Sequence, residues 1–229
     1  MSTTSALIVA AGRGTRMGPG VDKLFLEVAG APVIAHAWRR METCAAIDEL
    51  VLVVRPGWES SFQRIAVEQG FRKPFRLTVG GAERQDSVAN GLRALSPDCE
   101  WVAIHDGARP CTAASAIERC LEAARRVGAA VAAQRATDTI KESDGQKQIA
   151  RHLDRTRLWS VQTPQCFRVE VIRRALEAVV KAGRQVTDDT AACELIGQAV
   201  ELVECPEPNP KVTTPADLPW VELLLTRLP

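Results

Sequence analysis

The sequence lacks both an excess of charge of one sign and any apolar run that could cross a bilayer. Its 229 residues include 29 Lys or Arg and 28 Asp or Glu, so the formal net charge is +1. Such a chain is unsuited to non-specific binding of nucleic acid or anionic membranes, and any anion must be held by a local basic cluster. No apolar run approaches the roughly 20 residues that span a bilayer. The N-terminus also lacks a basic segment ahead of a long apolar core, so we expect a cytoplasmic protein.

Metal-binding patterns are also missing from the sequence. The seven cysteines are scattered without any C-x-x-C pair, so we expect reduced thiols and no structural zinc site. His36, His105 and His152 stand alone, and we expect them to pack or form ordinary hydrogen bonds. There is no internal repeat, low-complexity tract or interdomain linker, and 46% of the residues are hydrophobic. The length and composition fit one generous α/β domain or two small ones, and since no linker is found we predict a single domain over residues 1–229.

What the chain does contain, near its start, is an apolar run that opens into a glycine-rich basic loop, ALIVAAGRGTRMGPGVDK (residues 6–23). Residues 6–9 have the continuous apolar character of a strand buried on both faces. The small residues that follow leave backbone amides bare, and glycines let those amides turn toward an anion. We therefore predict a polyphosphate-binding loop. Its small residues are Ala10, Ala11, Gly12 and Gly14, and its basic residues are Arg13, Arg16 and Lys23.

Two other kinds of phosphate loop do not fit this spacing. The pattern G-x-G-x-x-x-G is one residue too long for the dinucleotide fingerprint, and G-x-x-x-x-G-K-[ST] does not occur in the chain. Neither a dehydrogenase nor a P-loop NTPase is expected. The alternative is a plain turn after a strand, but the two alanines and three basic residues favour a ligand.

Apolar runs and helical patterns alternate through most of the chain. Such alternation predicts an α/β fold with a Rossmann-like, mostly parallel sheet flanked by helices. Ligands of such sheets bind beyond the carboxyl ends of the strands. We expect further strands at 48–55, 75–79, 101–104, 129–133 and 199–204. We expect helices at 33–43, 58–70, from the turn near 86 to about 95, at 113–127, at 169–182 and at the C-terminal end.

Two more loops follow predicted strands. The first, GGAERQDS (80–87), would on its own be a strand-to-helix turn with Asp86 or Ser87 near the helix N-terminus. The second is HDGARP (105–110). A carboxylate at a strand end that faces a polyphosphate suits Mg²⁺, which takes one or two carboxylates together with phosphate oxygens and water. Asp106 is therefore a candidate metal ligand, and the alternatives are an acid at a helix N-terminus or an ion pair with Arg109. Arg109 is itself a candidate for binding a second phosphate.

Residues 135–159 are too polar for a buried crossover. The segments TIK (139–141) and QIA (148–150) flank an Asp-Gly turn signal, which predicts a protruding β-hairpin arm. An exposed two-stranded hairpin is marginally stable alone. Ile140, Ile149 and Leu153 therefore need another surface, and a two-fold related copy of the chain supplies one. We predict a homodimer formed through this arm.

Six motifs, in order, resemble the 2-C-methyl-D-erythritol 4-phosphate cytidylyltransferase family over nearly the whole chain. They are AAGRGTRMG with Lys23, GGAERQDSV, HDGARP, LDRTRLWSVQTPQ, TDD and NPKVTTPADL. The resemblance implies that CTP and 2-C-methyl-D-erythritol 4-phosphate give the cytidine diphosphate derivative and pyrophosphate, a step of non-mevalonate isoprenoid synthesis. It also implies Mg²⁺ as cofactor, CTP and a polyol phosphate as small-molecule partners, and a single-domain fold whose arm serves dimerisation.

The resemblance also implies roles for particular residues. Lys211, which would otherwise be read as a solvated surface lysine, gains a role at the α-phosphate. The implied catalytic residues are Arg16, Lys23 and Lys211, and Asp106 is the implied metal ligand. The implied nucleotide contacts are Ala10, Ala11, Gly12, Gly81 and Ser87, beside the loop glycine Gly14. The implied polyol phosphate contacts are Arg109, Thr139, Arg155, Thr163 and Thr187.

Two departures and two alternatives accompany this resemblance. Val9 stands where many members have proline, and Gly107 where many have alanine, so local rigidity beside the site is in question. A ribitol 5-phosphate cytidylyltransferase would share the CTP motifs and differ in the acceptor pocket. A nucleotide-binding regulator that has lost its chemistry is the alternative from another class, although Arg16, Lys23, Asp106 and Lys211 are all retained.

Overall fold

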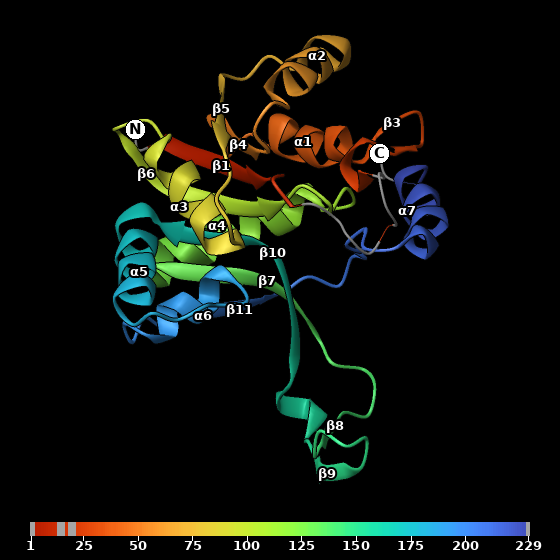
Figure 1. The fold of residues 1–229 in the computed structure, drawn as a ribbon, viewed down its shortest axis with the longest axis vertical. Helices are drawn as coiled ribbons and strands as arrows, with labels where there is room; N and C mark the ends of the chain where they lie inside the picture. Colours follow the sequence, from red (N-terminus) through yellow and green to blue (C-terminus); the bar gives the residue numbers. More distant parts are fainter. Residues whose placement is uncertain (1–2, 13–16, 18–21, 228–229) are drawn as a thin grey trace.

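A computed structural model describes residues 3–12, 17 and 22–227, which form a mixed sheet with helices on both faces and a projecting hairpin (Figure 1). The sheet contains β1 (Thr3–Val9), β4 (Glu49–Val54), β5 (Phe75–Val79), β6 (Cys99–Asp106), β7 (Ala129–Arg135), β10 (Trp159–Arg168) and β11 (Glu201–Glu204). Its order is β11-β7-β10-β6-β1-β4-β5. All neighbours are parallel except β10, which runs antiparallel to β6 and β7. The predicted mostly parallel α/β sheet is confirmed.

Most of the helices lie at the positions that the sequence patterns indicate, whereas α6 (Asp189–Glu194) is not among the predicted helices. The predicted helix at 33–43 is confirmed, and the predicted 58–70 helix ends where Gly70 adopts a left-handed conformation, with φ of 65°. The helices are α1 (Val33–Thr43), α2 (Glu59–Gln69), α3 (Arg84–Arg93), α4 (Ala114–Val127), α5 (Val169–Lys181), α6 (Asp189–Glu194) and α7 (Leu218–Leu225). Short elements are η2 (Lys23–Phe25), β2 (Glu27–Val28), β3 (Ala31–Pro32), η3 (Arg155–Arg157) and η4 (Pro215–Asp217). No helix in the described residues is long and apolar enough to cross a membrane.

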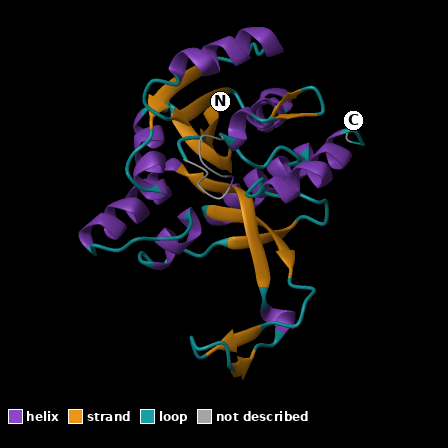
Figure 2. Cartoon of the chain, turned by 45° about the vertical axis from the view of Figure 1, so that its right-hand side comes forward, coloured by secondary structure: helices purple, strands orange, loops and turns teal. Residues whose placement is uncertain are grey.

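The continuous apolar runs of the central strands follow from burial on both faces of the sheet (Figure 2). In β4 every residue is buried. Leu50 and Leu52 enter the core under α1, α2 and α4, around Trp38, whereas Val51 and Val53 enter the opposite core under α3, α5 and α6. A third, smaller apolar cluster lies under α7 and includes Val212.

The order of the strands creates a crevice at one end of the sheet. From β1 the chain adds β4 and β5 on one side, then returns to place β6 on the other side. The loops after β1 and β6 therefore leave the sheet side by side, and the Gly107 amide donates to the Val9 carbonyl (3.0 Å). Such a switch point is the usual ligand position in open α/β sheets. β6 extends two residues further than predicted at each end, which places Asp106 as its last residue.

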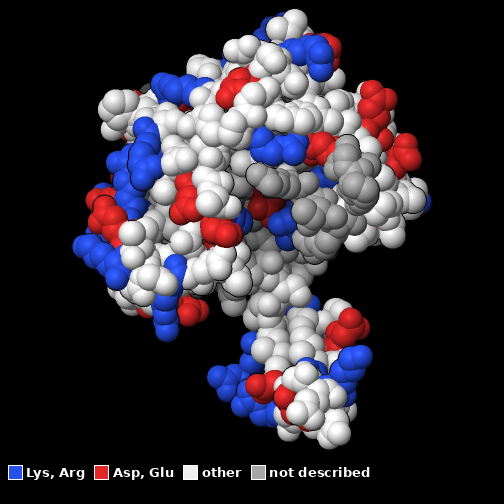
Figure 3. Space-filling model, viewed as in Figure 1, with Lys and Arg blue, Asp and Glu red and all other residues white. Residues whose placement is uncertain are grey.

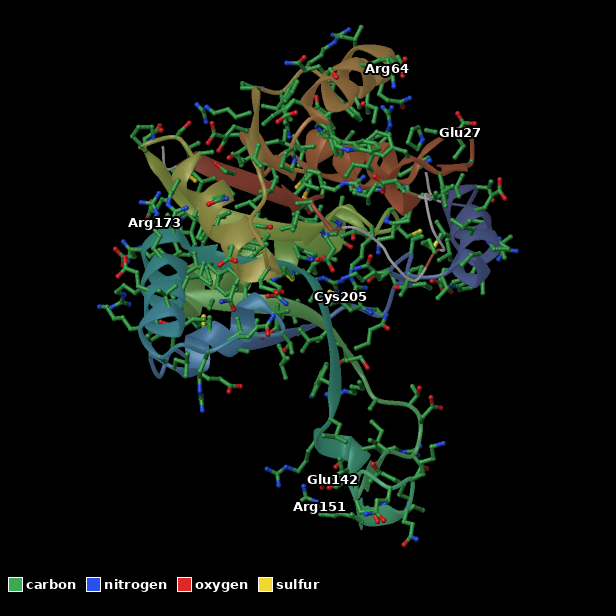
Figure 4. The ribbon with its side chains drawn as sticks, viewed as in Figure 1. Glu27, Arg64, Glu142, Arg151, Arg173 and Cys205 are labelled. Carbon is green, nitrogen blue, oxygen red and sulfur yellow. The ribbon has the colours of Figure 1, made fainter. Side chains whose placement is uncertain are left out.

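The arm leaves the body between β7 and β10 and projects away from it (Figure 1). Its tip is a small hairpin of β8 (Lys141–Ser143) and β9 (Ile149–His152), as predicted, and every residue of these strands is exposed. Glu142 and Arg151 form an ion pair across the hairpin (2.7 Å), and Figure 4 shows them side by side at the tip. Exposed pairs of this kind add little stability, so the tip has no core of its own.

At the opposite end of the sheet, the buried carboxylate of Glu49 joins β1, β4, β5 and the segment after α3. It accepts hydrogen bonds from Ser5 Oγ (2.6 Å), Ser96 Oγ (2.5 Å) and the Ser96 amide (3.1 Å), and it pairs with Arg76 (2.8 Å). Burial alone would raise the pKa of Glu49, but these hydrogen bonds and the Arg76 charge hold the pKa below its usual value.

We predict that Glu49→Gln lowers the free energy of unfolding at pH 7 by about 2 kcal/mol, because charge-assisted hydrogen bonds are lost. Since the pKa of Glu49 is lower in the folded state, its contribution is present above the unfolded pKa of about 4.3 and lost as pH falls through the folded pKa. Urea unfolding of both proteins at pH 7 and near pH 3.5 measures the difference. Exposed Glu68→Gln is the control, and an equal loss at both pH values would contradict this assignment.

Candidate functional site

The crevice above β1 and β6 contains a pocket of about 350 Å³. In the space-filling view, acidic and basic side chains gather near the middle of this face, above the arm (Figure 3). The loops after β1, β5 and β6, the short helix η2 and the segment before α7 all contribute to its wall. Of the residues expected in the site, Ala10, Ala11, Gly12, Lys23, Gly81, Ser87, Asp106 and Lys211 line this pocket. Arg16 and Gly14 lie outside the described residues.

Asp106 is the electrostatic centre of the pocket. Its Oδ2 atom lies 2.8 Å from Lys211 Nζ and 3.6 Å from Arg109 Nε, and its Oδ1 atom lies 3.6 Å from Arg84 Nε. Burial would raise the pKa of this carboxyl, but Lys211, Arg84 and Arg109 together hold the pKa well below its usual range. Asp106 is therefore ionised at neutral pH, and three segments distant in sequence meet at it.

The two expected lysines are linked through the backbone of the C-terminal segment. Lys23, in η2, is only 8% exposed, and its ammonium donates to the Val212 carbonyl (2.8 Å). The Val212 amide in turn donates to the Ala108 carbonyl (2.8 Å). The residue before Val212 is Lys211, so these bonds hold the Lys211 backbone against the loop that follows β6. Lys211 is thus a partly exposed lysine paired with Asp106, in contrast to the solvated surface lysine that was the alternative to a role in the site.

The second loop keeps its backbone close to the first. The Gly81 amide donates to Ser87 Oγ (3.1 Å), and the Ser87 hydroxyl donates to the Glu83 carbonyl (3.1 Å). A Cβ at Gly80 would overlap the Cβ of Ala11 and lie 2.9 Å from Ser87 Oγ, so only glycine fits there. The helix N-cap is Glu83, in a capping box with Asp86. Small residues in both loops thus leave backbone exposed to the pocket.

Beneath Asp106 lies a buried network of neutral polar groups. The Thr163 hydroxyl accepts from the Asp106 amide (3.1 Å) and contacts His105 Nδ1 (3.0 Å), while His105 Nε2 contacts the Arg109 carbonyl (3.0 Å). A carbonyl can only accept, so Nε2 carries the hydrogen and Nδ1 accepts from the Thr163 hydroxyl. Burial lowers the pKa of His105 to about 4, so the ring is neutral. Asn209 completes this network by donating to the Thr163 carbonyl (2.9 Å).

The predicted polyol phosphate contacts lie in three places. Arg109 and Thr163 are beside Asp106, and Arg109 Nη1 donates to the Asn209 carbonyl (2.7 Å). Thr187 is exposed in the loop before α6. Thr139 and Arg155 are exposed on the arm, where Arg155 Nη1 donates to the Thr137 carbonyl (2.6 Å). One chain therefore does not bring all five together at the pocket.

Sequence reasoning missed Arg84 and Asp189. Arg84, the first residue of α3, lines the pocket and pairs with Asp106 on one side and with Asp189 (2.8 Å) on the other. Burial would lower the pKa of Arg84, but the two carboxylates raise it, so the guanidinium stays charged. Burial raises the pKa of Asp189, which Arg84 opposes. Both residues belong to motifs already noted, GGAERQDSV and TDD, but their pairing depends on the tertiary fold, which brings the first residues of α3 and α6 together.

Gly107 lies where many members of the family that this chain resembles have alanine. A Cβ at this position would lie 2.7 Å from the Cδ1 atom of Ile34 and 3.2 Å from the Val9 carbonyl. The end of a flexible isoleucine can move by a few tenths of an ångström, so the glycine leaves room but is not demanded by the backbone.

Known proteins with similar sequences belong to the family whose motifs form this pocket. The profile of the 2-C-methyl-D-erythritol 4-phosphate cytidylyltransferase family matches residues 4–227. Proteins of that name from Pelotomaculum thermopropionicum and Geobacillus kaustophilus are 42% and 43% identical; the aligned residues make up 98% and 96% of this chain and 95% and 96% of theirs.

Solved structures give the same result. The 4-diphosphocytidyl-2C-methyl-D-erythritol synthase of Anaerococcus prevotii superposes with a TM-score of 0.87 at 29% identity, covering 99% of each chain. The 2-C-methyl-D-erythritol 4-phosphate cytidylyltransferase of Thermus thermophilus superposes with a TM-score of 0.80 at 31% identity, covering 99% of this chain and 100% of the other. The chain belongs to the 2-C-methyl-D-erythritol 4-phosphate cytidylyltransferase family.

Proposed function

We propose that this protein transfers CMP from CTP to 2-C-methyl-D-erythritol 4-phosphate and releases pyrophosphate. The observation that carries the proposal is the convergence of Lys23, Lys211 and Asp106 on one pocket floored by bare backbone. The small residues Ala11 and Gly12 leave backbone exposed to the pocket, which suits recognition of a base edge, and the lysines suit a triphosphate. The curated relatives carry the name of this activity over nearly the full length of the chain.

The chemistry needs alignment and charge neutralisation more than proton transfer. An oxygen of the acceptor's phosphate monoester attacks the α-phosphorus of CTP in line, and pyrophosphate leaves. Because that oxygen is already ionised, no strong general base is required. Lys211 can stabilise the charge that develops at the α-phosphate, and Lys23, whose ammonium donates to the neighbouring Val212 carbonyl, can hold another part of the triphosphate. Arg16 is proposed to act with Lys23.

The metal-ligating groups of the pocket suit Mg²⁺ only together with the phosphate oxygens of a bound nucleotide. No group of three or more His, Cys, Asp or Glu residues that could hold a metal occurs among the described residues, so the protein alone offers no complete cage. Asp106 supplies one ionised carboxylate, and Mg²⁺ is commonly held by one or two carboxylates plus phosphates and water. We therefore propose Asp106 as the ligand of a nucleotide-borne Mg²⁺, which would neutralise phosphate charge.

The acceptor is proposed to lie between two subunits. Arg109, Thr163 and Thr187 belong to the body, whereas Thr139 and Arg155 lie on the projecting arm. The arm exposes 70% of Ile149 and has no described core at its tip. A two-fold related copy would cover this surface and bring the arm residues to the partner's pocket. We propose that the enzyme is a homodimer with shared acceptor sites.

The activity is tested by measuring pyrophosphate release from CTP and Mg²⁺ with each acceptor. We expect turnover with 2-C-methyl-D-erythritol 4-phosphate and, at equal concentration, about tenfold or more slower turnover with ribitol 5-phosphate, because the acceptor pocket must discriminate two polyols. Faster turnover with ribitol 5-phosphate would contradict the acceptor assignment. No release with either acceptor would favour a nucleotide-binding regulator.

Lys211→Ala is predicted to lower kcat about a hundredfold, equivalent to roughly 3 kcal/mol of transition-state stabilisation. The fold should survive, because this lysine is half-exposed and Arg84 and Arg109 still face Asp106. Steady-state kinetics with thermal unfolding as a fold check measures the effect. Exposed Lys181→Ala on α5 is the matched control, and normal kcat in folded Lys211→Ala would refute the assigned role.

Sharing of sites is tested by mixing Lys211→Ala with Arg155→Ala and allowing subunits to exchange. If the arm acts on the partner, each heterodimer has one site with both lesions and one site with none. About a quarter of all sites then recover in an equal, random mixture. If each subunit is self-contained, every site keeps one lesion. Absence of recovery despite demonstrated heterodimers, or a monomer at assay concentration, would rule out shared sites.

A further inference from the structure

Asp189, the first residue of α6, is a buried carboxylate with a single charged partner. It is 1% exposed, and its Oδ2 atom lies 2.8 Å from Arg84 Nη2. Its amide donates to Gln165 Oε1 (3.1 Å), which fixes its backbone on β10. Among the described residues, no backbone amide or hydroxyl group donates to either carboxylate oxygen. A buried charge with so few partners is unfavourable for folding, so its presence calls for another explanation.

Arg84 lies between this carboxylate and Asp106. Its Nε atom is 3.6 Å from Asp106 Oδ1, which is an ion-pair distance but longer than a hydrogen bond. Lys211 contacts the other oxygen, Oδ2, at 2.8 Å. Arg84 therefore adds positive charge next to Asp106 without forming a close hydrogen bond to Oδ1.

Arg109 shows the same arrangement on the other side of Asp106. Its Nε atom is 3.6 Å from Oδ2, and its Nη1 atom donates to the Asn209 carbonyl (2.7 Å). Both arginines are thus anchored at their far ends and kept at a distance from Asp106. The anchors differ, because that of Arg109 is a neutral carbonyl whereas that of Arg84 is the carboxyl group of Asp189.

We propose that Asp189 is a positioning residue that keeps Arg84 at ion-pair distance from Asp106 and so leaves Oδ1 open to the Mg²⁺ that accompanies CTP. This inference rests on the proposed function, in which CTP and its Mg²⁺ bind in the pocket. Without a negative charge at position 189, Asp106 becomes the nearest carboxylate for Arg84. Guanidinium groups bind carboxylates closely and often through two hydrogen bonds, so Arg84 then competes with the metal ion.

A simpler role for this pair would be to fasten α3 to α6. The two roles predict different behaviour when both charges are removed. If the pair only fastens the helices, Asp189→Asn and the double variant Asp189→Asn with Arg84→Gln are equally impaired. If Asp189 restrains Arg84, the single variant is impaired and the double variant recovers, since no arginine remains to close on Asp106.

The experiment is isothermal titration calorimetry of CTP binding at a series of MgCl₂ concentrations, without acceptor, on wild type and both variants. We expect Asp189→Asn to need about tenfold or more Mg²⁺ for half-maximal binding, and the double variant to return to within about threefold of wild type. Arg93→Gln, an exposed charge removal on the same helix, is the matched control and should match wild type. Thermal unfolding reports on the fold of each protein.

Each other outcome also decides the question. Wild-type binding by folded Asp189→Asn, or a double variant as weak as the single one, would overturn the positioning role while leaving the proposed function intact. If Asp189→Asn does not fold, the double variant decides alone: binding near the wild-type level supports the proposal, and loss of binding or of folding overturns it. If wild type itself shows no Mg²⁺-dependent CTP binding, the proposed function fails and this inference fails with it.

Discussion

The site depends on one buried carboxylate that gathers cations from distant parts of the chain. Asp106 ends β6, Arg84 begins α3, and Lys211 precedes α7, yet all three meet in one pocket. Cations this close would repel one another in a partly buried pocket, and the charge of Asp106 offsets that repulsion. The carboxylate therefore holds Lys211 in the pocket, ready for a more highly charged anion, which reduces the reorganisation needed when a triphosphate binds.

The sheet that creates this meeting point could largely be predicted from the sequence, because its signals are local. Continuous apolar runs identify strands buried on both faces, and Gly70 marks the end of α2 through its left-handed backbone. β10 is different. Its middle carries Gln162, Thr163 and Gln165, and its antiparallel direction follows from the excursion of the arm that precedes it. Strand alternation alone does not reveal such a reversal.

The residues of the site also fall into two groups: some can be recognised from local sequence motifs, and others only from their tertiary contacts. Small residues after β1 and β5, an aspartate at the end of β6 and a lysine after the first loop are visible in motifs, and they do line one pocket. The roles of His105, Asn209, Arg84 and Asp189 are set by partners that lie far away in the sequence. An isolated histidine gives no sign that it will be neutral and will orient Thr163, because that depends on complete burial. Charge type is local information, whereas charge pairing is not.

The arm makes the proposed acceptor binding depend on subunit association as well as on the pocket. At its base, the guanidinium of Arg135 stacks on Trp159 with 4.4 Å between the charge centre and the ring centroid, which stiffens the exit from the sheet. Toward the tip, stabilisation by the chain itself falls away, since the residues of β8 and β9 are all exposed. If acceptor contacts lie on this segment, they are ordered only when a partner covers it. Acceptor binding and subunit association would then be thermodynamically linked, so that dimerisation raises acceptor affinity and the acceptor favours the dimer.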